Sequence, residues 1–147
     1  MSVKLIENPT EGDILYVNSL TRDSFTGVEV PPESHLRNAV KSGRLFLSIP
    51  QDSQPVGYAI VTERYDAPWL FSMAVDPYAR KCGYGQGLLK AVTNDAYDRG
   101  HRMVGLTVKQ DNIGAQIMYL KAGFIVELVM YNYYIDADGL LMRKRWK

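Results

Sequence analysis

A glycine-rich stretch in the middle of the chain has the composition of a phosphate-binding turn. It reads Arg80-Lys81-Cys82-Gly83-Tyr84-Gly85-Gln86-Gly87. Glycines at alternate positions let the backbone turn tightly and leave no side chains between its N–H groups and a ligand. An apolar run precedes the stretch and a helical pattern follows it, so the first N–H groups of that helix would face the ligand. The spacing matches neither G-x-G-x-x-G nor a P-loop, and a tight strand-to-helix connection without a ligand is the alternative.

A second group of polar residues lies in the segment from Asn112 to Phe124. Asn112, Ala115 and Tyr119 are three and seven positions apart, so they share one face of a helix. Asn112 is also a good helix cap, and Gly123 is typical of a helix end. One interpretation of this shared face is a binding or catalytic role. The alternatives are an asparagine that only caps the helix and a half-buried core tyrosine.

Strand and helix patterns alternate along the chain. Expected helices cover about 13–24, 32–42, 86–98 and 112–121, and expected strands cover 3–6, 44–49, 56–61, 69–75, 103–108, 124–131 and 140–146. The second and third strands should form a hairpin, as should the last two. This order predicts an α/β fold with one mixed central sheet of six or seven strands, helices on both faces and a C-terminal β-hairpin.

Length and composition limit the possibilities further. The 147 residues indicate a single domain over 1–147, with ordinary globular contents of 46% hydrophobic and 22% charged residues. A net charge of +1 argues against a broad nucleic-acid footprint. The single Cys82 allows no internal disulfide, and no apolar run approaches the roughly 20 residues of a membrane span. We therefore expect a cytoplasmic protein, a monomer or homodimer, without a metal site.

The two polar groups together resemble the GNAT superfamily of acyl-coenzyme A N-acyltransferases. The similarity covers Arg44 to Phe124 and rests on a strand, Arg-x-x-Gly-x-Gly and a helix, then a strand and Asn-x-x-Ala-x-x-x-Tyr-x-x-x-Gly-Phe. It implies the GNAT fold, whose sheet splays at the cofactor site, and acetyl-CoA as cofactor. The implied binding uses the backbone of the glycine turn for the pyrophosphate and the preceding strand for pantetheine. The implied cofactor residues are Met73, Ala74, Val75, Arg80, Lys81, Cys82, Gly83, Tyr84, Gly85, Gln86, Asn112, Ala115 and Tyr119.

The implied reaction moves an acetyl group from the thioester directly to a primary amine. Tyr119 would face the sulfur and protonate the leaving thiolate, because a tyrosine pKa of about 10 is close to a thiol pKa of about 8.5. A backbone N–H near Met73 or Ala74 could stabilise the oxyanion. A covalent mechanism through Cys82 is not expected, because no histidine or acid follows it at a recognisable spacing.

The sequence defines the general base less well. Glu63 follows a predicted strand, near a position where some family members keep a carboxylate, and it is our candidate. A solvated loop charge is the alternative for this residue, and Asp66 and Glu29 are weaker candidates. We expect His35 to lie in a helix and His101 at a helix end, where neither is placed to act.

The last segment of the chain indicates the acceptor. It resembles the hairpin of the protein N-terminal acetyltransferases, the branch that includes the ribosomal-protein alanine N-acetyltransferase. This implies that Tyr133 and Tyr134 line a peptide groove, with cross-strand packing as the alternative. Thr107 departs from that branch, whose members often carry Glu or His there. A small amine (polyamine, aminoglycoside or amino acid) and non-catalytic acyl-CoA binding are therefore alternatives. An acidic pocket would favour a polyamine, and a tyrosine-walled groove would favour a peptide.

Overall fold

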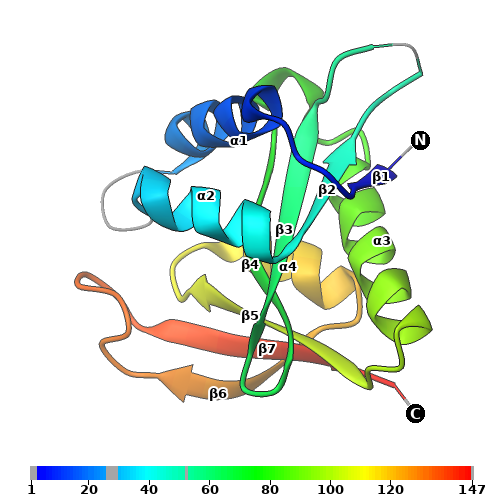
Figure 1. The fold of residues 1–147 in the computed structure, drawn as a ribbon. Coiled ribbons are helices and arrows are strands. Elements are labelled where there is room, and N and C mark those ends of the chain that lie inside the picture. The colour runs from blue at the N-terminus through cyan, green and yellow to red at the C-terminus, as the bar shows by residue number, and fades with distance from the viewer. Residues whose placement is uncertain (1–2, 26–29, 52, 147) are drawn as a thin grey trace.

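The computed structural model describes residues 3–25, 30–51 and 53–146 and shows one mixed sheet with helices on both faces (Figure 1). The strand order is β1-β2-β3-β4-β5-β7-β6, and within it the β4–β5 pair is parallel and the other pairs are antiparallel. The predicted α/β fold with its C-terminal hairpin is confirmed. The strands are β1 (Val3–Ile6), β2 (Arg44–Ser48), β3 (Gly57–Arg64), β4 (Ala67–Val75), β5 (Met103–Lys109), β6 (Ile125–Met130) and β7 (Gly139–Arg145). The helices are α1 (Glu11–Ser24), α2 (Glu33–Ser42), the short 3-10 helix η2 (Pro77–Ala79), α3 (Tyr84–Asp98) and α4 (Ile113–Lys121).

Helix α1 begins two residues earlier than its apolar pattern predicts, because of a capping box. The Thr10 hydroxyl accepts from the backbone N–H of Asp13 at 3.2 Å, and the Asp13 carboxylate accepts from the backbone N–H of Thr10 at 2.9 Å. Two N-terminal donors are thereby satisfied by one pair of residues. Helix α2 begins after Pro32, as predicted from proline's fixed φ.

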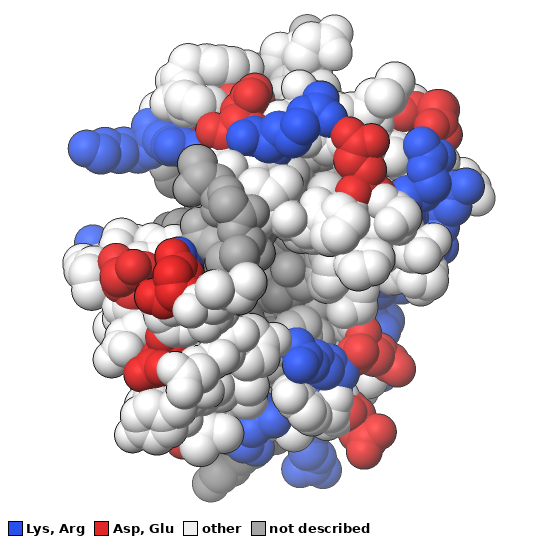
Figure 2. Space-filling view, turned by 90° about the vertical axis from the view of Figure 1, so that its left-hand side faces the viewer, with Lys and Arg blue, Asp and Glu red and all other residues white. Residues whose placement is uncertain are grey.

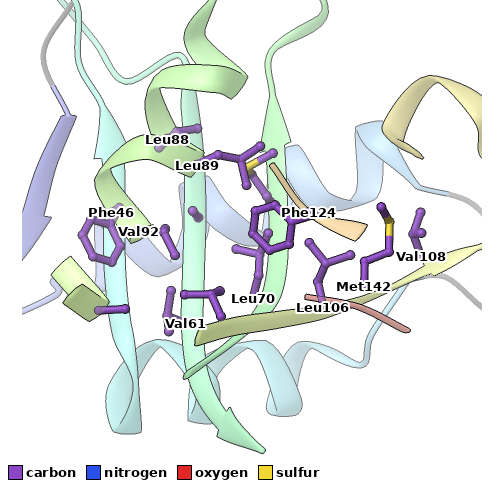
Figure 3. Packing of buried hydrophobic residues seen from close by; sticks show 14 of the residues in the cluster. Phe46, Val61, Leu70, Leu88, Leu89, Val92, Leu106, Val108, Phe124 and Met142 are labelled. Atoms are coloured by element: carbon purple, nitrogen blue, oxygen red, sulfur yellow. The ribbon is translucent and has the colours of Figure 1, made fainter. Parts of the chain in front are cut away.

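Two apolar clusters fill the space on either side of the sheet. One lies under α1 and α2 and includes Ile14, Val17 and Leu36. The other lies under α3 and α4, where side chains from α3 meet Leu106 of β5 and Phe124, the residue just before β6 (Figure 3). Burying each such side chain is worth roughly 1.5–3 kcal/mol, so these clusters fix the helices that carry the site.

Strands β4 and β5 pair at one position and diverge beyond it. Their parallel register consists of Trp69 opposite Gly105. Strand β4 nevertheless continues to Val75, and β5 continues to Lys109. The splay implied by the resemblance is therefore present, and over this length β4 is paired on its β3 side alone.

A bulge interrupts β4 at the start of the splay. The register with β3 shifts so that Phe71 has no partner, while Leu70 and Ser72 do. Leu70 faces the cluster under α3. The Ser72 hydroxyl instead bonds Tyr58, which belongs to the cluster under α1 and α2. The bulge thus re-aims the side chains that follow it.

The β3–β4 connection is shorter than predicted. Tyr65 and Asp66 alone form the turn, with φ values of 55° and 60°, and positive φ at both central residues is the mark of a type I′ turn. Glu63 lies inside β3 opposite Pro68, and not after the strand as predicted. The sequence does not predict this turn, because Pro68 argues against a strand and a tyrosine such as Tyr65 is uncommon at positive φ.

An ion-pair cluster holds the terminal hairpin. Glu127 of β6 accepts from Arg145 Nε at 2.6 Å and from Arg143 Nη1 at 3.0 Å, both on β7. Arg145, and then Arg143, lower the pKa of Glu127 to about 2. These charges therefore join the two strands that flank the turn segment 131–138.

The charges on the surface are mixed. On the face in Figure 2, basic and acidic side chains are interspersed, in keeping with the net charge of +1. Among the described residues no helix is long and apolar enough to cross a membrane. In the same part of the chain, no group of three or more His, Cys, Asp or Glu side chains is arranged to hold a metal ion.

Candidate functional site

A cavity of about 730 Å³ lies where β4 and β5 diverge. Strand β4 runs along it from Trp69 to Val75, a span of about 20 Å at the usual rise per residue. We call the part beyond Val75, which includes Arg80, Lys81, Tyr84 and Gly85, the glycine end. The part formed by Arg64, Trp69, Tyr133 and Tyr134 is the aromatic end.

The glycine end presents backbone N–H groups at the start of α3. Lys81 and Gly83 have φ values of 63° and 87°, so the chain turns sharply before α3. Helix α3 begins at Tyr84 and no side chain caps it, which leaves its first N–H groups available to a ligand. Gly83 alone of the turn glycines needs positive φ. Gly85 is inside the helix, where a Cβ would lie 2.8 Å from the Met118 sulfur.

Asn112 and Ala115 line the cavity from the start of α4. The Asn112 Oδ1 accepts from the backbone N–H of Ala115 at 3.2 Å, so its capping role is confirmed. The cap uses the amide oxygen and leaves the NH₂ group as a donor toward the cavity. Across from them, the Oγ1 of Thr107 is buried and has no hydrogen-bond partner among the described residues.

Tyr119 lines the same cavity about one helical turn beyond Ala115, and its ring centroid lies 6.0 Å from that of Phe124. Burial, and then the nearby hydroxyls of Tyr134 and Tyr58, raise the pKa of the Tyr119 phenol above its usual range. The near balance expected between this phenol and a thiolate therefore needs correction. A raised pKa favours the protonated phenol, whose hydroxyl can donate a hydrogen bond, and makes loss of its proton uphill.

The aromatic end holds a cation among three rings. The Arg64 Cζ lies 5.0 Å from the ring centroid of Tyr65, 5.4 Å from that of Trp69 and 5.9 Å from that of Tyr133. Arg64 Nη1 also donates to the Tyr133 hydroxyl at 2.8 Å. Tyr133 in turn meets Tyr134 edge to face at 5.1 Å. This contact joins the β3–β4 turn to the terminal hairpin.

The charged side chains of the cavity wall are basic. Arg64, Arg80, Lys81 and Lys109 line it, and no Asp or Glu does so among the described residues. Lys109 pairs with Asp136 at 2.9 Å, outside the wall. The described residues therefore do not form the acidic pocket that would favour a polyamine.

The structure brings most of the predicted site residues together. Those that line the cavity are Met73, Ala74, Val75, Arg80, Lys81, Tyr84, Gly85, Asn112, Ala115, Tyr119, Tyr133 and Tyr134. Cys82, Gly83 and Gln86 contribute no lining side chain, and the Gln86 amide donates to the Met118 carbonyl at 3.0 Å. Glu63 and Asp66 are exposed outside the wall, and Glu29 lies outside the described residues.

One expectation about the histidines needs correction. His35, predicted to be out of place for chemistry, lines the cavity from the first turn of α2. His101 does not line it.

Sequence reasoning missed Arg64, Trp69 and Ser72 as cavity residues. The first two flank the unrecognised turn Tyr65-Asp66, which pairs Arg64 with Ala67 and so makes Arg64 and Trp69 diagonal neighbours on the two strands. The cluster of one arginine with several aromatic residues was the available signal. The position of Ser72 depends on the bulge in β4, and the sequence contains no signal that predicts this bulge.

Comparisons with known proteins agree with this geometry. The sequence profile of the acetyltransferase (GNAT) family matches residues 14–124. The chain is 35% identical over 95 residues to the [ribosomal protein bS18]-alanine N-acetyltransferase of Haemophilus ducreyi, an alignment that covers 65% of this chain and 66% of that protein. It is 30% identical over 110 residues to the Escherichia coli protein of the same name, covering 74% of each.

A solved structure supports the fold over almost the whole chain. The ribosomal-protein-S18-alanine N-acetyltransferase from Escherichia coli superposes with a TM-score of 0.78. The match covers 98% of this chain and 94% of that one, at 23% sequence identity. At this identity the superposition is informative about the fold alone.

Proposed function

The chain belongs to the GNAT acetyltransferase family, and we propose that it acetylates the α-amino group at the amino terminus of a peptide or protein, in the cytoplasm. As a family member it takes the acetyl group from acetyl-CoA, which supplies the acyl group as an activated thioester. The acceptor named for its relatives is an alanine of ribosomal protein bS18. That name supports a protein amino terminus as the acceptor class here.

The residues at the glycine end fit acetyl-CoA. The uncapped start of α3 and the left-handed residues before it present N–H groups suited to a pyrophosphate. The β4 edge at Met73 and Val75 has no β5 partner and can bond an extended pantetheine arm as a strand would. Asn112 can donate its free NH₂ group to the same arm.

Tyr119 is the proposed acid at the reacting sulfur. Its raised pKa keeps the hydroxyl protonated, so it donates a hydrogen bond as negative charge develops on the leaving group. The cavity also holds the amine against the thioester, and this positioning supplies much of the rate.

Glu63 can accept the amine's proton only through intervening water, because its side chain is exposed and outside the cavity wall. Glu63→Gln tests this role. A relay through Glu63 predicts a fall in kcat on the order of 10²-fold, the low end of general base catalysis. Unchanged kcat would show that the proton leaves to solvent without it.

The basic cavity wall is the observation that favours a peptide amino terminus over a polycationic small amine as the acceptor. A peptide amino terminus has a single positive charge and an extended backbone, which suits a groove walled by Tyr133 and Tyr134. Polyamines and aminoglycosides carry several positive charges, and the wall offers them four basic side chains, of which Lys109 is paired with Asp136, and no described carboxylate.

The test is thiol release from acetyl-CoA with a panel of acceptors. The panel contains short peptides with free amino termini, the same peptides with the α-amine blocked, spermidine, an aminoglycoside and free amino acids. Turnover on the free peptides alone is the expected result. Turnover on small amines alone would overturn the proposed acceptor, and acetyl-CoA binding without any turnover would favour a non-catalytic module.

A further inference from the structure

Arg64 is held in one orientation at the aromatic end. Tyr65, Trp69 and Tyr133 surround its guanidinium at 5.0 to 5.9 Å, and the Tyr133 hydroxyl takes one of its N–H groups at 2.8 Å. Tyr65 and Trp69 themselves meet edge to face at 5.4 Å. A guanidinium fixed this way loses little side-chain entropy when it binds a ligand.

The charge of Arg64 is not neutralised by the protein around it. No ion pair joins it to a carboxylate in the part of the chain that the structure describes. Its neighbour Glu63 points to the opposite face of β3, because side chains alternate along a strand. The hydrogen bond to Tyr133 raises the pKa of Arg64, so the cation persists at any working pH.

We infer that Arg64 selects acceptor peptides that carry an acidic side chain within their first three residues, an inference that rests on the proposed function. The remaining N–H donors of the guanidinium match the two oxygens of a carboxylate. A Lys or Arg side chain in the same place would meet a fixed like charge.

The experiment compares peptides that differ at one position. Each peptide carries Glu, Gln or Lys either at its second or at its third residue. The kcat/KM of each peptide is measured at low and at high salt. We expect the Glu peptides to exceed the Lys peptides by about 10-fold at low salt, which corresponds to about 1.4 kcal/mol, and the ratio to shrink at high salt.

Variants separate Arg64 from the general charge of the protein. Arg64→Gln should bring the Glu and Lys peptides within twofold of each other. Arg64→Lys, which keeps the charge and loses the planar fork, should keep part of the preference. Arg102→Gln is the matched control, because Arg102 is an exposed arginine outside the cavity wall, and it should leave the ranking unchanged.

Two failures are distinguishable. If no peptide is acetylated by any variant, the proposed function fails. If peptides are acetylated but the Glu and Lys series are equal, or Arg64→Gln keeps their ranking, the role of Arg64 is refuted and the function stands.

A separate chain of hydroxyl groups ends at the cavity wall. Thr21 Oγ1 donates to the Val17 carbonyl at 2.6 Å and lies 2.6 Å from the Tyr58 hydroxyl. The Tyr58 hydroxyl lies 2.8 Å from Ser72 Oγ. Thr21 and Tyr58 are completely buried, whereas Ser72 lines the cavity.

The direction of these hydrogen bonds follows from the number of protons. A carbonyl can only accept, so Thr21 uses its single hydroxyl proton on Val17. Tyr58 must then donate to Thr21, and Ser72 must donate to Tyr58. The proton of Ser72 is therefore committed away from the cavity, and its remaining lone pairs are acceptors.

We propose that Ser72 binds the acceptor amine by accepting one of its N–H bonds, and that Thr21 and Tyr58 are positioning residues that set this polarity; this too rests on the proposed function. An amine held through one N–H keeps its lone pair free to face the thioester. A serine whose proton pointed into the cavity would instead donate to that lone pair and block attack.

Thr21→Val is the remote test, because Thr21 never touches the cavity. In this variant Tyr58 has lost the threonine oxygen that accepts its hydrogen bond. Tyr58 can then donate to Ser72, and the proton of Ser72 turns toward the cavity. We expect kcat/KM for the peptide to fall about 5-fold, Ser72→Ala to reduce it about 10-fold, and the KM for acetyl-CoA to stay unchanged in both. The double variant should be no worse than Ser72→Ala.

Thr93→Val is the matched control. Thr93 makes the same bond to a carbonyl four residues back, from Oγ1 to Leu89 at 2.8 Å, on α3 outside the cavity. It should leave kcat/KM unchanged. Additive losses in the double variant, an equal loss in the Thr93 variant, or wild-type kcat/KM in Ser72→Ala would refute the proposed polarity.

Discussion

The two ends of the cavity differ in how the chain forms them. The glycine end comes from one continuous stretch, in which Val75 to Gly85 leads from a strand into an uncapped helix. The aromatic end consists of side chains from distant parts of the chain, since Arg64 and Tyr133 are 69 positions apart. The first end suits a ligand common to a whole family, and the second can change without disturbing the first.

This difference predicts that substitutions separate into two groups. Changes at the glycine end should alter acetyl-CoA binding and spare the choice of acceptor. Changes at the aromatic end should alter the acceptor and spare the cofactor. Tyr119, which lies between them on α4, should affect the chemical step alone.

Tyr119→Phe should have the largest effect. Removing the phenolic donor should lower kcat on the order of 10²-fold, a size typical of losing a general acid, with acetyl-CoA affinity within twofold of wild type. The measurements are steady-state kinetics and calorimetric titration of acetyl-CoA. Tyr97→Phe, an exposed tyrosine on α3 outside the cavity, is the control.

The pH profile of the wild type sharpens this assignment. Because burial raises the pKa of Tyr119, its protonated form persists through neutral pH and well above it. The kcat should therefore show no loss on the alkaline side below about pH 10, the usual tyrosine pKa. A fall in kcat near pH 8 that disappears in Tyr119→Phe would contradict this role.

Gly83→Ala should separate cofactor binding from stability. At φ 87° a Cβ costs on the order of 1–2 kcal/mol, so the turn will shift, and we expect the KM for acetyl-CoA to rise about 10-fold. Gly100 has the same φ with nothing within 4 Å and lies outside the cavity. Gly100→Ala should therefore lose a similar amount of stability and bind acetyl-CoA normally. Equal KM values for the two variants would show that the turn does not hold the cofactor.

Gly105→Ala should disturb the aromatic end. Its Cβ would lie 2.8 Å from the Trp69 ring, at the one position where β4 and β5 pair. Overpacking of this kind costs roughly 1–3 kcal/mol and must move the ring that faces Arg64. Thermal unfolding should show the loss, and the peptide KM should rise while the acetyl-CoA KM stays constant. A rise in the acetyl-CoA KM instead would break the division between the two ends.

Glu127→Gln should have the smallest effect. Glu127 has a lowered pKa in the folded protein, so its stabilisation is present above the unfolded pKa of about 4.5 and is lost as pH falls toward 2. Because Arg145 is about half exposed, we expect a loss of only about 1 kcal/mol at pH 7, vanishing near pH 2. Unfolding curves at both pH values test this, and a pH-independent difference would contradict it.

The sequence predicts the glycine end well because that end is local. Strand, turn and helix signals adjoin one another there, and Asn112 with Tyr119 share a helix face by spacing alone. Element limits were wrong by a few residues where capping decides them, as at Thr10.

The aromatic end could not be predicted in the same way. It depends on a type I′ turn with a tyrosine at positive φ, and on a bulge at Phe71 that sets the direction of Ser72. Neither feature has a strong sequence signal. A longer turn would allow Glu63 to face the cavity directly, whereas the two-residue turn leaves it exposed outside the wall, and His35 reaches the cavity through the packing of α2.

The most direct test of the central claim is to locate the transferred acetyl group. A peptide with a free amino terminus and an internal lysine is incubated with acetyl-CoA and the enzyme, with spermidine present as a competitor, and the products are sequenced by mass spectrometry. The account predicts acetylation at the α-amine, with the lysine side chain and spermidine left unmodified. Acetyl groups on spermidine or on the lysine, with a free α-amine, would contradict it.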